Sequence, residues 1–391
     1  MTMRKLLVSL PLIATSILGG CNSEPNIEPA DLIFSGGAVF TSDPEQPTAS
    51  AVAVRGKHIV YVGEERGVIP FIGVSTRQIN IQDGLLISGL MDSHTHVFNG
   101  SFSDVGVNLS LADTREKLQV ALEAIRDANP GTGPVYARGW QNHLFPKTGP
   151  KAQQLDEIFG DRIVILGSVD GHSRWFSSRA LREGGVDANY PDPHPGVSFF
   201  ERDSLTNEPL GTGREKAGEH ITAKFIPGDK SAYQERFVRW LPRAAAAGLT
   251  GVYDAWAAAP SEQEAYEIWH SISESGGLSL RVFGSVRETD SADLIANRFK
   301  KFEQNFSSEM VRPEAIKLAA DGVPEGHTAF LLTPYVDSNN EDFGHPMISK
   351  EDMTANITTY FGADIPVHIH AIGGGAVRMS LDAIEAARTT T

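Results

Sequence analysis

The sequence has 391 residues, 41% of them hydrophobic and 21% charged, which is enough for a substantial core in one large domain or in two to three ordinary ones. The 49 acidic and 34 basic residues give a net charge of −15, which argues against a nucleic-acid surface because phosphate binding needs a basic stripe. The single Cys excludes a disulfide framework and a Cys-rich zinc site.

Residues 1–20 form a predicted export signal. A basic start precedes an apolar run at 6–18, which is too short to span a bilayer as a mature helix. Leu18-Gly19-Gly20-Cys21 resembles the lipobox of bacterial lipoproteins, which implies cleavage before Cys21 and lipidation of its thiol; a plain signal peptide with an incidental Cys is the alternative. We therefore expect residues 21–30 to tether an exported protein to the membrane, on the periplasmic side of the cell envelope.

Residues 31–87 predict a small all-β unit. Short apolar runs alternate with turn signals such as Gly36-Gly37 and Asp83-Gly84. The runs lie at 32–34, 51–54, 58–62 and 77–81. A further apolar run at 85–91 leads into Asp92-Ser93-His94-Thr95-His96.

From residue 230 onward, helices and strands alternate, which is typical of a parallel α/β fold. Ser231 with Gln234, and Ser261 with Glu264, fit capping boxes at two helix starts. The expected helices lie at 231–247, 262–275, 291–305, from 349 onward and at 376–388, and the expected strands at 249–254, 280–286, 315–322 and 365–370. With the run at 85–96, the sequence predicts five such strands.

Residues 98–230 interrupt this alternation between the first and the second strand. They contain an expected helix at 115–128, capped by Thr114, and two apolar runs at 135–140 and 162–166. An insertion of this length at a strand end is often a lid or a substrate-facing subdomain.

His94 and His96 are the first candidate metal ligands. Alternate residues of a strand point the same way, so both imidazoles can reach one metal ion, as zinc commonly requires. A bare His-x-His pair is more often core or surface. The whole segment Gly89-Leu90-Met91-Asp92-Ser93-His94-Thr95-His96, however, closely resembles the first-strand motif of the amidohydrolase superfamily.

Several further segments resemble the YtcJ-like branch of that superfamily, often labelled amidohydrolase family 3. They are Arg138-Gly139-Trp140; Asp170-Gly171-His172 followed by Ser177-Ser178-Arg179-Ala180-Leu181; Gly248-Leu249-Thr250-Gly251-Val252-Tyr253-Asp254; Lys317-Leu318-Ala319-Ala320-Asp321-Gly322; and His368-Ile369-His370-Ala371-Ile372-Gly373. The resemblance spans residues 31–388. It implies an α/β protein with a TIM-type (β/α) barrel in residues 88–391, preceded by a small β half-sandwich in residues 31–87.

The resemblance also implies a site at the strand ends with one or two divalent metal ions, expected to be zinc. Its implied ligands are His94, His96, Lys317 and His370. A Lys in an apolar strand is costly to bury unless its charge is lost or paired, so Lys317 either reaches solvent from the strand end or sits neutral. In the second case the resemblance implies that Lys317 takes up carbon dioxide and that the resulting carbamate bridges two ions.

Four residues are candidates for lining a substrate pocket. For each of them, a role in packing or in a turn is the alternative. They are His172, Trp140, Trp175 and Asp321. Asp254 is equally well a turn or cap residue. His368 shares a strand face with His370 and is expected either to support the site or to pack in the core.

One segment departs from the family pattern. The usual motif continues with Gly-Asp after the Ile, whereas this chain has Gly373-Gly374-Gly375. The missing carboxylate is expected to loosen the loop or to remove a hydrogen-bond partner.

The implied function is hydrolysis of a small-molecule, amide-like C–N bond other than a peptide bond, by a metal-activated water at the C-terminal ends of the strands. The resemblance also implies a His on strand six and an Asp on strand eight, whereas the sequence ends after five strands. We therefore expect a partial barrel in a C-terminally incomplete chain. Two interpretations stay open: a metal-dependent hydrolase whose chain is truncated, and a catalytically inactive lipoprotein remnant that retains metal or partner binding.

Overall fold

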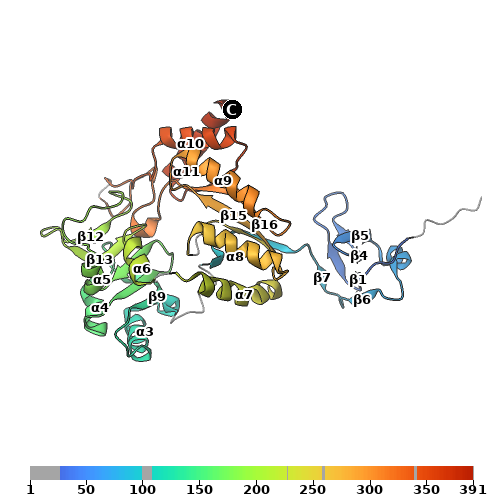
Figure 1. The fold of residues 1–391 in the computed structure, drawn as a ribbon, viewed down its shortest axis with the longest axis horizontal. Coiled ribbons are helices and arrows are strands. Elements are labelled where there is room, and N and C mark those ends of the chain that lie inside the picture. Colours follow the sequence, from blue (N-terminus) through green and yellow to red (C-terminus); the bar gives the residue numbers. More distant parts are fainter. Residues whose placement is uncertain (1–26, 99–107, 227, 258–259, 339–340, 391) are drawn as a thin grey trace, which may run out of the picture. The chain divides into compact units, whose positions relative to one another are not determined.

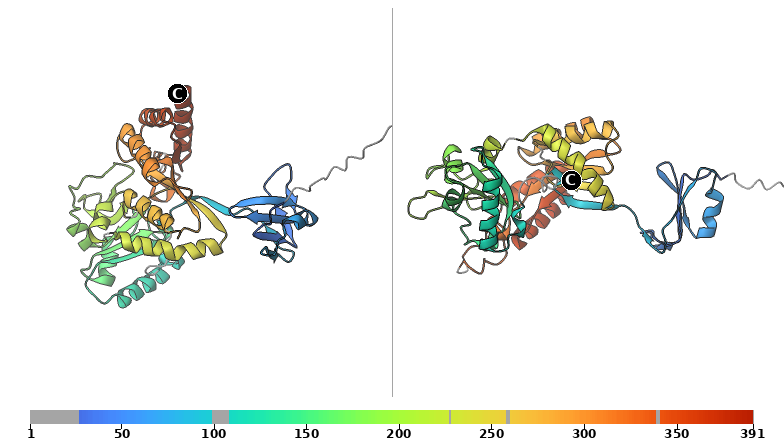
Figure 2. Two further views of the ribbon diagram at one scale, coloured as in Figure 1. Left: turned by 45° about the vertical axis from the view of Figure 1, so that its right-hand side comes forward. Right: turned by 90° about the horizontal axis from the view of Figure 1, so that it is seen from below.

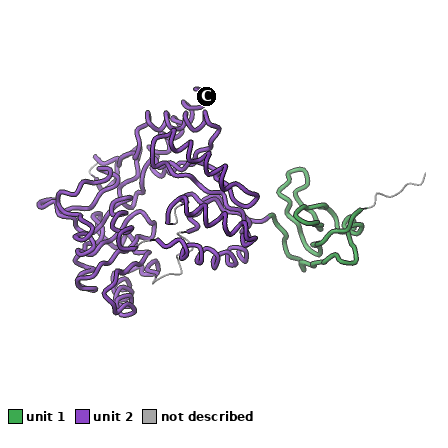
Figure 3. Tube along the Cα trace, viewed as in Figure 1, with its two compact units in different colours: residues 1–88 green, residues 89–391 purple. Residues whose placement is uncertain are grey.

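The computed structural model describes residues 27–98, 108–226, 228–257, 260–338 and 341–390. The chain divides into two compact units, residues 1–88 and residues 89–391 (Figure 3). The predicted export signal and Cys21 lie outside the described residues. Within the described ranges, no helix is both long and apolar enough to cross a membrane.

The first unit consists of two small sheets and a short helical segment. The sheets have the strand orders β5-β4-β1-β6 and β3-β2-β7. Its elements are β1 (Leu32–Ser35), β2 (Ala38–Phe40), β3 (Thr48–Ala49), β4 (Ala51–Arg55), β5 (His58–Gly63), α1 (Glu65–Val68), η1 (Ile69–Phe71), β6 (Arg77–Asn80) and β7 (Leu85–Leu86). Strands β1, β4 and β5 and the helical segment share a small core that contains Ile33, Ala51, Ala53 and Val68.

The second unit is built on a curled parallel sheet with the strand order β17-β16-β15-β14-β8. The strands are β8 (Leu90–Thr95), β14 (Leu249–Asp254), β15 (Arg281–Arg287), β16 (Val311–Ala319) and β17 (Val367–His370). The helices that follow them are α7 (Lys230–Ala246), α8 (Glu262–Glu274), α9 (Ala292–Phe306), α10 (Lys350–Gly362) and α11 (Gly374–Thr390). All four strand pairings are parallel, so the predicted partial (β/α) barrel with five strands is confirmed (Figure 1 and Figure 2).

The strand expected at 85–96 is two strands and not one. β7 pairs with β2 in the first unit, whereas β8 pairs with β14 in the second. The apolar run is continuous in sequence, so its hydrophobicity alone does not reveal the break between Leu86 and Leu90.

Apolar side chains at helical spacing attach the helices to the parallel sheet. On α8, Ala265, Ile268, Trp269 and Ile272 follow the i, i+3, i+4, i+7 pattern and are buried. The Trp269 ring stacks on Phe98, with ring centroids 5.2 Å apart. This core packs the helices against the sheet whose strand ends carry the candidate ligands.

Helix starts follow the predicted caps with one exception. Ser261 caps α8 as predicted, by accepting a hydrogen bond from the Glu264 backbone N–H at 3.2 Å. The Glu264 carboxylate accepts from the Ser261 hydroxyl at 2.7 Å and not from its backbone N–H, so the predicted capping box is formed only in part. At α7 the N-cap is Asp229, which accepts from the Ser231 backbone N–H, so the predicted cap at Ser231 is wrong. Asp and Ser are about equally good caps, and only the backbone path decides between two of them so close together.

Residues 108–226 form a second sheet with the strand order β12-β13-β11-β10-β9. The elements of this insertion are η2 (Leu109–Leu111), α3 (Arg115–Ala128), β9 (Val135–Trp140), η3 (Asn142–Leu144), α4 (Ala152–Phe159), β10 (Val164–Ser168), β11 (Ser173–Phe176), α5 (Ser178–Glu183), β12 (Phe200–Arg202), β13 (Pro209–Arg214) and α6 (Glu219–Phe225). β9 and β10 pair in parallel and the other pairs are antiparallel. As predicted, Thr114 caps α3 by accepting from the Lys117 backbone N–H at 3.2 Å.

Candidate functional site

The candidate ligands gather at the C-terminal ends of the parallel strands. His94 lies near the end of β8, and His96 is the first residue after this strand. The ring centroids of the two histidines are 5.7 Å apart. His368 on β17 reaches the same place, with its ring centroid 4.8 Å from that of His94. The His368 ring also stacks on Tyr253, at 5.0 Å between centroids. His368 therefore bridges the histidines of β8 and the aromatic packing inside the sheet.

Lys317 is the buried centre of this group. It stands on β16 opposite His368 of β17, and only 3% of its surface is exposed. Its Nζ atom has no hydrogen-bond partner among the residues that the structure describes. Burial lowers the pKa of Lys317 to about 8, so about a tenth of the amine is neutral at pH 7 and about half at pH 8. Of the two alternatives that the sequence left open, the structure therefore favours the buried amine over a side chain that reaches solvent.

The surrounding imidazoles are neutral at physiological pH. Burial, with the nearby His94 and Lys317 charges, lowers the pKa of His96 to about 4. Burial and the same two neighbours lower that of His368 to about 4 as well. The pKa values of His94 and His370 are lowered too, in both cases mainly by burial. Neutral imidazole is the form of His that binds metal ions.

The donor set fits a divalent ion in its chemistry. Two imidazoles that share a tetrahedral ion place their ring centroids about 5 Å apart, given metal–nitrogen bonds of about 2 Å. The ring centroids of His94 and His96 are 5.7 Å apart, close to this value. Among the described residues, no three His, Cys, Asp or Glu side chains already stand at metal-binding spacing, so ligation would require side-chain rotation.

A cavity of about 200 Å³ opens beside these ligands. Barrel residues and residues of the insertion line it together. The barrel contributes His96, Trp256, Lys317, Ala319, Asp321, Met347 and His370, and the insertion contributes Asp170, Gly171, His172, Arg174, Glu215, Lys216 and Glu219. The cavity thus joins the candidate metal ligands to a wall made by a separate sheet.

His172 lies next to His370 at the cavity and is held by Glu215. The two imidazole centroids lie 5.3 Å apart, and His172 Nδ1 is 2.7 Å from Glu215 Oε2. Burial lowers the pKa of His172, but the hydrogen bond and charge of Glu215 outweigh it, and the net direction is upward. Sequence reasoning did not select Glu215, because nothing in Arg214-Glu215-Lys216 indicates a buried carboxylate.

Asp321 lines the cavity, but its carboxylate accepts hydrogen bonds from backbone N–H groups. It accepts hydrogen bonds from the backbone N–H groups of Phe330, Ile372 and Gly373, at 2.8, 2.9 and 2.8 Å. The start of the loop after β17 is therefore anchored to Asp321, at Ile372 and Gly373. A Cβ atom at Gly373 would overlap the carbonyl group of Phe330, so the close approach requires glycine there.

Two predicted pocket residues lie elsewhere. Trp140 is completely buried in the core of the insertion and donates from Nε1 to the Leu166 carbonyl at 3.0 Å. Trp175 is 2% exposed and donates to the Lys151 carbonyl at 2.9 Å. Both tryptophans pack the insertion sheet, so the expectation that they line the pocket is wrong. The aromatic residue at the pocket is Trp256, which no motif singled out.

Asp254 takes the turn role, one of the two roles that the sequence left open. It is fully buried, and its Oδ1 accepts from the Trp256 backbone N–H at 3.0 Å. Burial raises its pKa to about 7, although backbone hydrogen bonds oppose the shift. It stabilises the loop after β14 and does not line the cavity.

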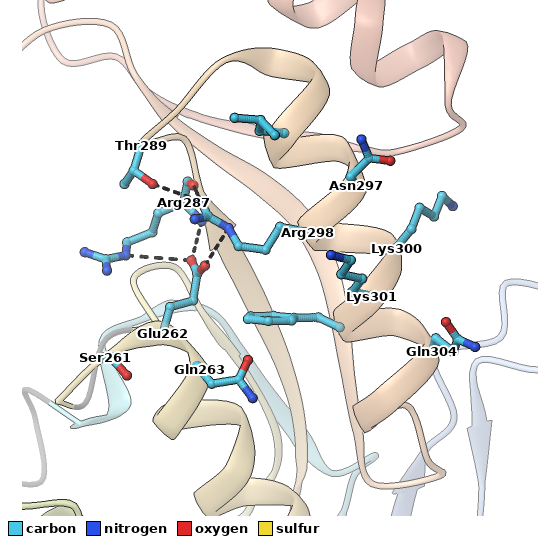
Figure 4. A pocket seen from close by; sticks show the side chains of 12 residues that line it. Ser261, Glu262, Gln263, Arg287, Thr289, Asn297, Arg298, Lys300, Lys301 and Gln304 are labelled. Carbon is cyan, nitrogen blue, oxygen red and sulfur yellow. Dashed lines mark hydrogen bonds and ion pairs between the residues drawn. The ribbon is translucent and has the colours of Figure 1, made fainter.

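A larger hollow of about 780 Å³ lies between the start of α8, the end of β15 and α9. Figure 4 shows Glu262 there, with its carboxylate 3.7 Å from Arg287 Nε and 3.1 Å from Arg298 Nε. Glu262 also accepts from the Arg287 backbone N–H at 2.6 Å. The charges at its centre are therefore paired with one another, and none of the candidate ligands lines it.

Comparisons with known proteins agree with this architecture. A profile of the amidohydrolase family matches residues 77–391. The exoenzymes regulatory protein AepA of Pectobacterium carotovorum subsp. carotovorum is 27% identical over 369 residues, covering 91% of this chain and 77% of AepA. The protein YtcJ of Bacillus subtilis (strain 168) is 26% identical over 360 residues, covering 90% of this chain and 65% of YtcJ.

A solved structure shares the fold. The crystal structure of a metal-dependent hydrolase from Pyrococcus horikoshii OT3 aligns with a TM-score of 0.64 at 19% sequence identity, covering 90% of this chain and 68% of that one. The chain thus spans about two thirds to three quarters of the length of these relatives. Because the family profile covers most of the sequence, including all five strands of the curled sheet, the chain belongs to the amidohydrolase family.

Proposed function

We propose that this chain is a metal-dependent hydrolase of small-molecule, amide-like C–N bonds. It holds one or two divalent ions, with zinc as the expected metal. The proposed ligands are His94, His96, Lys317 and His370. The observation that carries the proposal is the buried Nζ of Lys317, which has no hydrogen-bond partner among the described residues and stands amid neutral imidazoles. The name of the Pyrococcus protein, a metal-dependent hydrolase, supports the requirement for a metal.

When bound, a divalent ion supplies Lewis-acid activation of a water molecule and of a substrate carbonyl. The side chains of this protein position the loops and form the wall of the cavity. Asp321 fixes the loops that border the cavity, through its three backbone hydrogen bonds. Trp256 gives the cavity an apolar wall, and the small volume favours a small substrate.

The neutral amine of Lys317 also suits carbamate formation. Its lone pair attacks carbon dioxide, a C–N bond forms, and the released proton passes to solvent. The product is a carboxylate in the place of a buried ammonium. Mass spectrometry of gently handled protein is expected to find a carbon dioxide adduct on Lys317, absent in Lys317→Met. An unmodified Lys317 in zinc-loaded protein would refute the carbamate.

The hydrolase proposal is tested with purified protein stripped by a chelator and reloaded with zinc. Assays against a panel of N-acylated small molecules are expected to detect turnover only after reloading. The variant His370→Ala is expected to lose turnover and to bind zinc more weakly. His143→Ala removes an exposed imidazole outside the cavity and serves as the matched control. Protein that neither binds zinc nor turns over any compound would overturn the proposal.

We also propose that the chain is exported and anchored by lipid at Cys21. The support is the segment Leu18-Gly19-Gly20-Cys21 after an apolar run. Cells that express the full chain and are fed a labelled fatty acid are expected to label it, and Cys21→Ser is expected to abolish the label and to leave the membrane fraction. Equal labelling of the wild type and of Cys21→Ser would contradict lipid attachment at Cys21.

A further inference from the structure

His172 and Glu215 form a buried pair beside the candidate ligands. The carboxylate of Glu215 is an acceptor, so the short contact from its Oε2 to His172 Nδ1, 2.7 Å, places a proton on Nδ1. The Nε2 atom of a neutral His172 ring then keeps its lone pair. Because His172 lines the cavity, this lone pair is available to a partner there.

Three contacts hold Glu215 in place from different parts of the chain. Its Oε1 accepts from the Thr328 hydroxyl at 2.8 Å, and its backbone N–H donates to the His172 carbonyl at 2.7 Å. Gly322 lies so close that a Cβ atom there would overlap Thr328 and the Glu215 carboxylate. The Glu215 backbone also has φ of +51°, a left-handed conformation that costs free energy for a residue with a side chain. Strain of this kind commonly persists at functional sites because the surroundings over-determine it.

His370, which also lines the cavity, has one ring nitrogen fixed by a hydrogen bond in a similar way. Its Nε2 lies 3.3 Å from the Gly322 carbonyl oxygen, which can only accept, so Nδ1 is the nitrogen left with a lone pair. The His370 and His172 ring centroids are 5.3 Å apart, close to the spacing of about 5 Å for two imidazoles on one tetrahedral ion. Metal-binding histidines usually donate their second N–H to a carboxylate or a backbone carbonyl, and these two residues show one case each.

We propose that His172, oriented by Glu215, is a further metal ligand, contributed by the insertion to the centre that contains Lys317 and His370. This inference rests on the proposed function, since it extends the same metal site. Glu215 acts as a positioning residue and does not itself touch the metal. The insertion thereby supplies part of the metal centre, in addition to one wall of the cavity.

The test uses zinc alone as the probe. Zinc affinity of the full chain is measured by competition with a chromophoric chelator, and X-ray absorption counts the imidazoles bound to the zinc. His172→Ala is expected to lower the affinity and to remove one imidazole from the count. Glu215→Gln is expected to lower the affinity about 10-fold to 100-fold, the usual effect of losing a partner of a ligating His. Glu157→Gln, on the exposed side of α4, is the matched control.

A second variant separates ligation from folding. His172→Asn keeps an N–H near the position of Nδ1 for Glu215 but has no counterpart of Nε2, so it is expected to keep the thermal midpoint of the metal-free protein and still lose zinc affinity. Wild-type affinity and an unchanged imidazole count in both His172 variants, with weaker binding in His370→Ala, would overturn this inference alone. A wild-type chain that binds no zinc would overturn the proposed function as well.

Discussion

The buried carboxyl of Asp254 predicts a pH-dependent stability that one substitution removes. Its side chain is fully buried, and Oδ2 has no hydrogen-bond partner among the described residues. Burial raises its pKa from 3.8 to about 7, so the folded chain holds a proton that the unfolded chain releases. At about 1.4 kcal/mol per pKa unit, this difference corresponds to about 4 kcal/mol of unfolding free energy. Because the folded chain binds this proton more tightly, the stabilisation by protonated Asp254 is fully present below pH 4. The unfolding free energy then falls as the pH rises, and this stabilisation is lost by about pH 7.

Urea unfolding of wild type and Asp254→Asn at several pH values between 4 and 8 measures this contribution. Other titrating groups are common to both chains, so the difference between their unfolding free energies isolates Asp254. We expect the wild type to lose about 4 kcal/mol relative to Asp254→Asn across this range. Asp293→Asn, an exposed change at the start of α9, is the matched control. A difference between wild type and Asp254→Asn that stays constant with pH would refute the reasoning.

Three further substitutions have defined outcomes in urea unfolding. Gly322→Ala is expected to lower the unfolding free energy by about 1–3 kcal/mol, because its methyl group would overlap Thr328 and Glu215; an unchanged midpoint would contradict this close packing. Trp269→Ala is expected to cost about 3–5 kcal/mol, since the ring is completely buried; a loss below 1 kcal/mol would show that the core there collapses freely. Lys317→Met is expected to raise the unfolding free energy of metal-free protein at pH 7, because it removes a buried amine whose pKa is lowered to about 8. This gain in unfolding free energy should fall as the pH rises from about 8 towards 10.5. A gain that does not depend on pH would exclude the charge of Lys317 as its cause.

The parts of the site that follow from strand geometry could be predicted from the sequence. The alternation rule places His94 and His96 on one face, and the meeting of parallel strands at one edge brings Lys317 and His370 to the same end. The apolar strand Ala315-Ile316-Lys317-Leu318 left two positions possible for the amine of Lys317, and only the packed sheet shows that it is buried.

The contribution of the insertion could not be predicted in this way. Glu215 reaches the cavity through a left-handed backbone turn and a bond to Thr328, which is more than a hundred residues away in the sequence. No local pattern encodes such a contact. The predictions for Trp140 and Trp175 were wrong because the local sequence allows two positions. An aromatic residue near a strand end suits both a pocket and a core, and only the packed sheet distinguishes the two.

The pairing of β8 with β14 has a consequence for how the chain folds. The two strands are neighbours in the sheet, yet about 150 residues separate them in the sequence, and the entropic cost of closing a loop rises with the logarithm of its length. The insertion that fills this interval pairs its strands mostly with near neighbours in the sequence, which are contacts that form quickly. We expect the insertion sheet to form first and the docking of β8 to be a late step. A newly made chain would then expose the edge of β14 until that step, which makes this edge the point where a chaperone or a mispaired strand would compete.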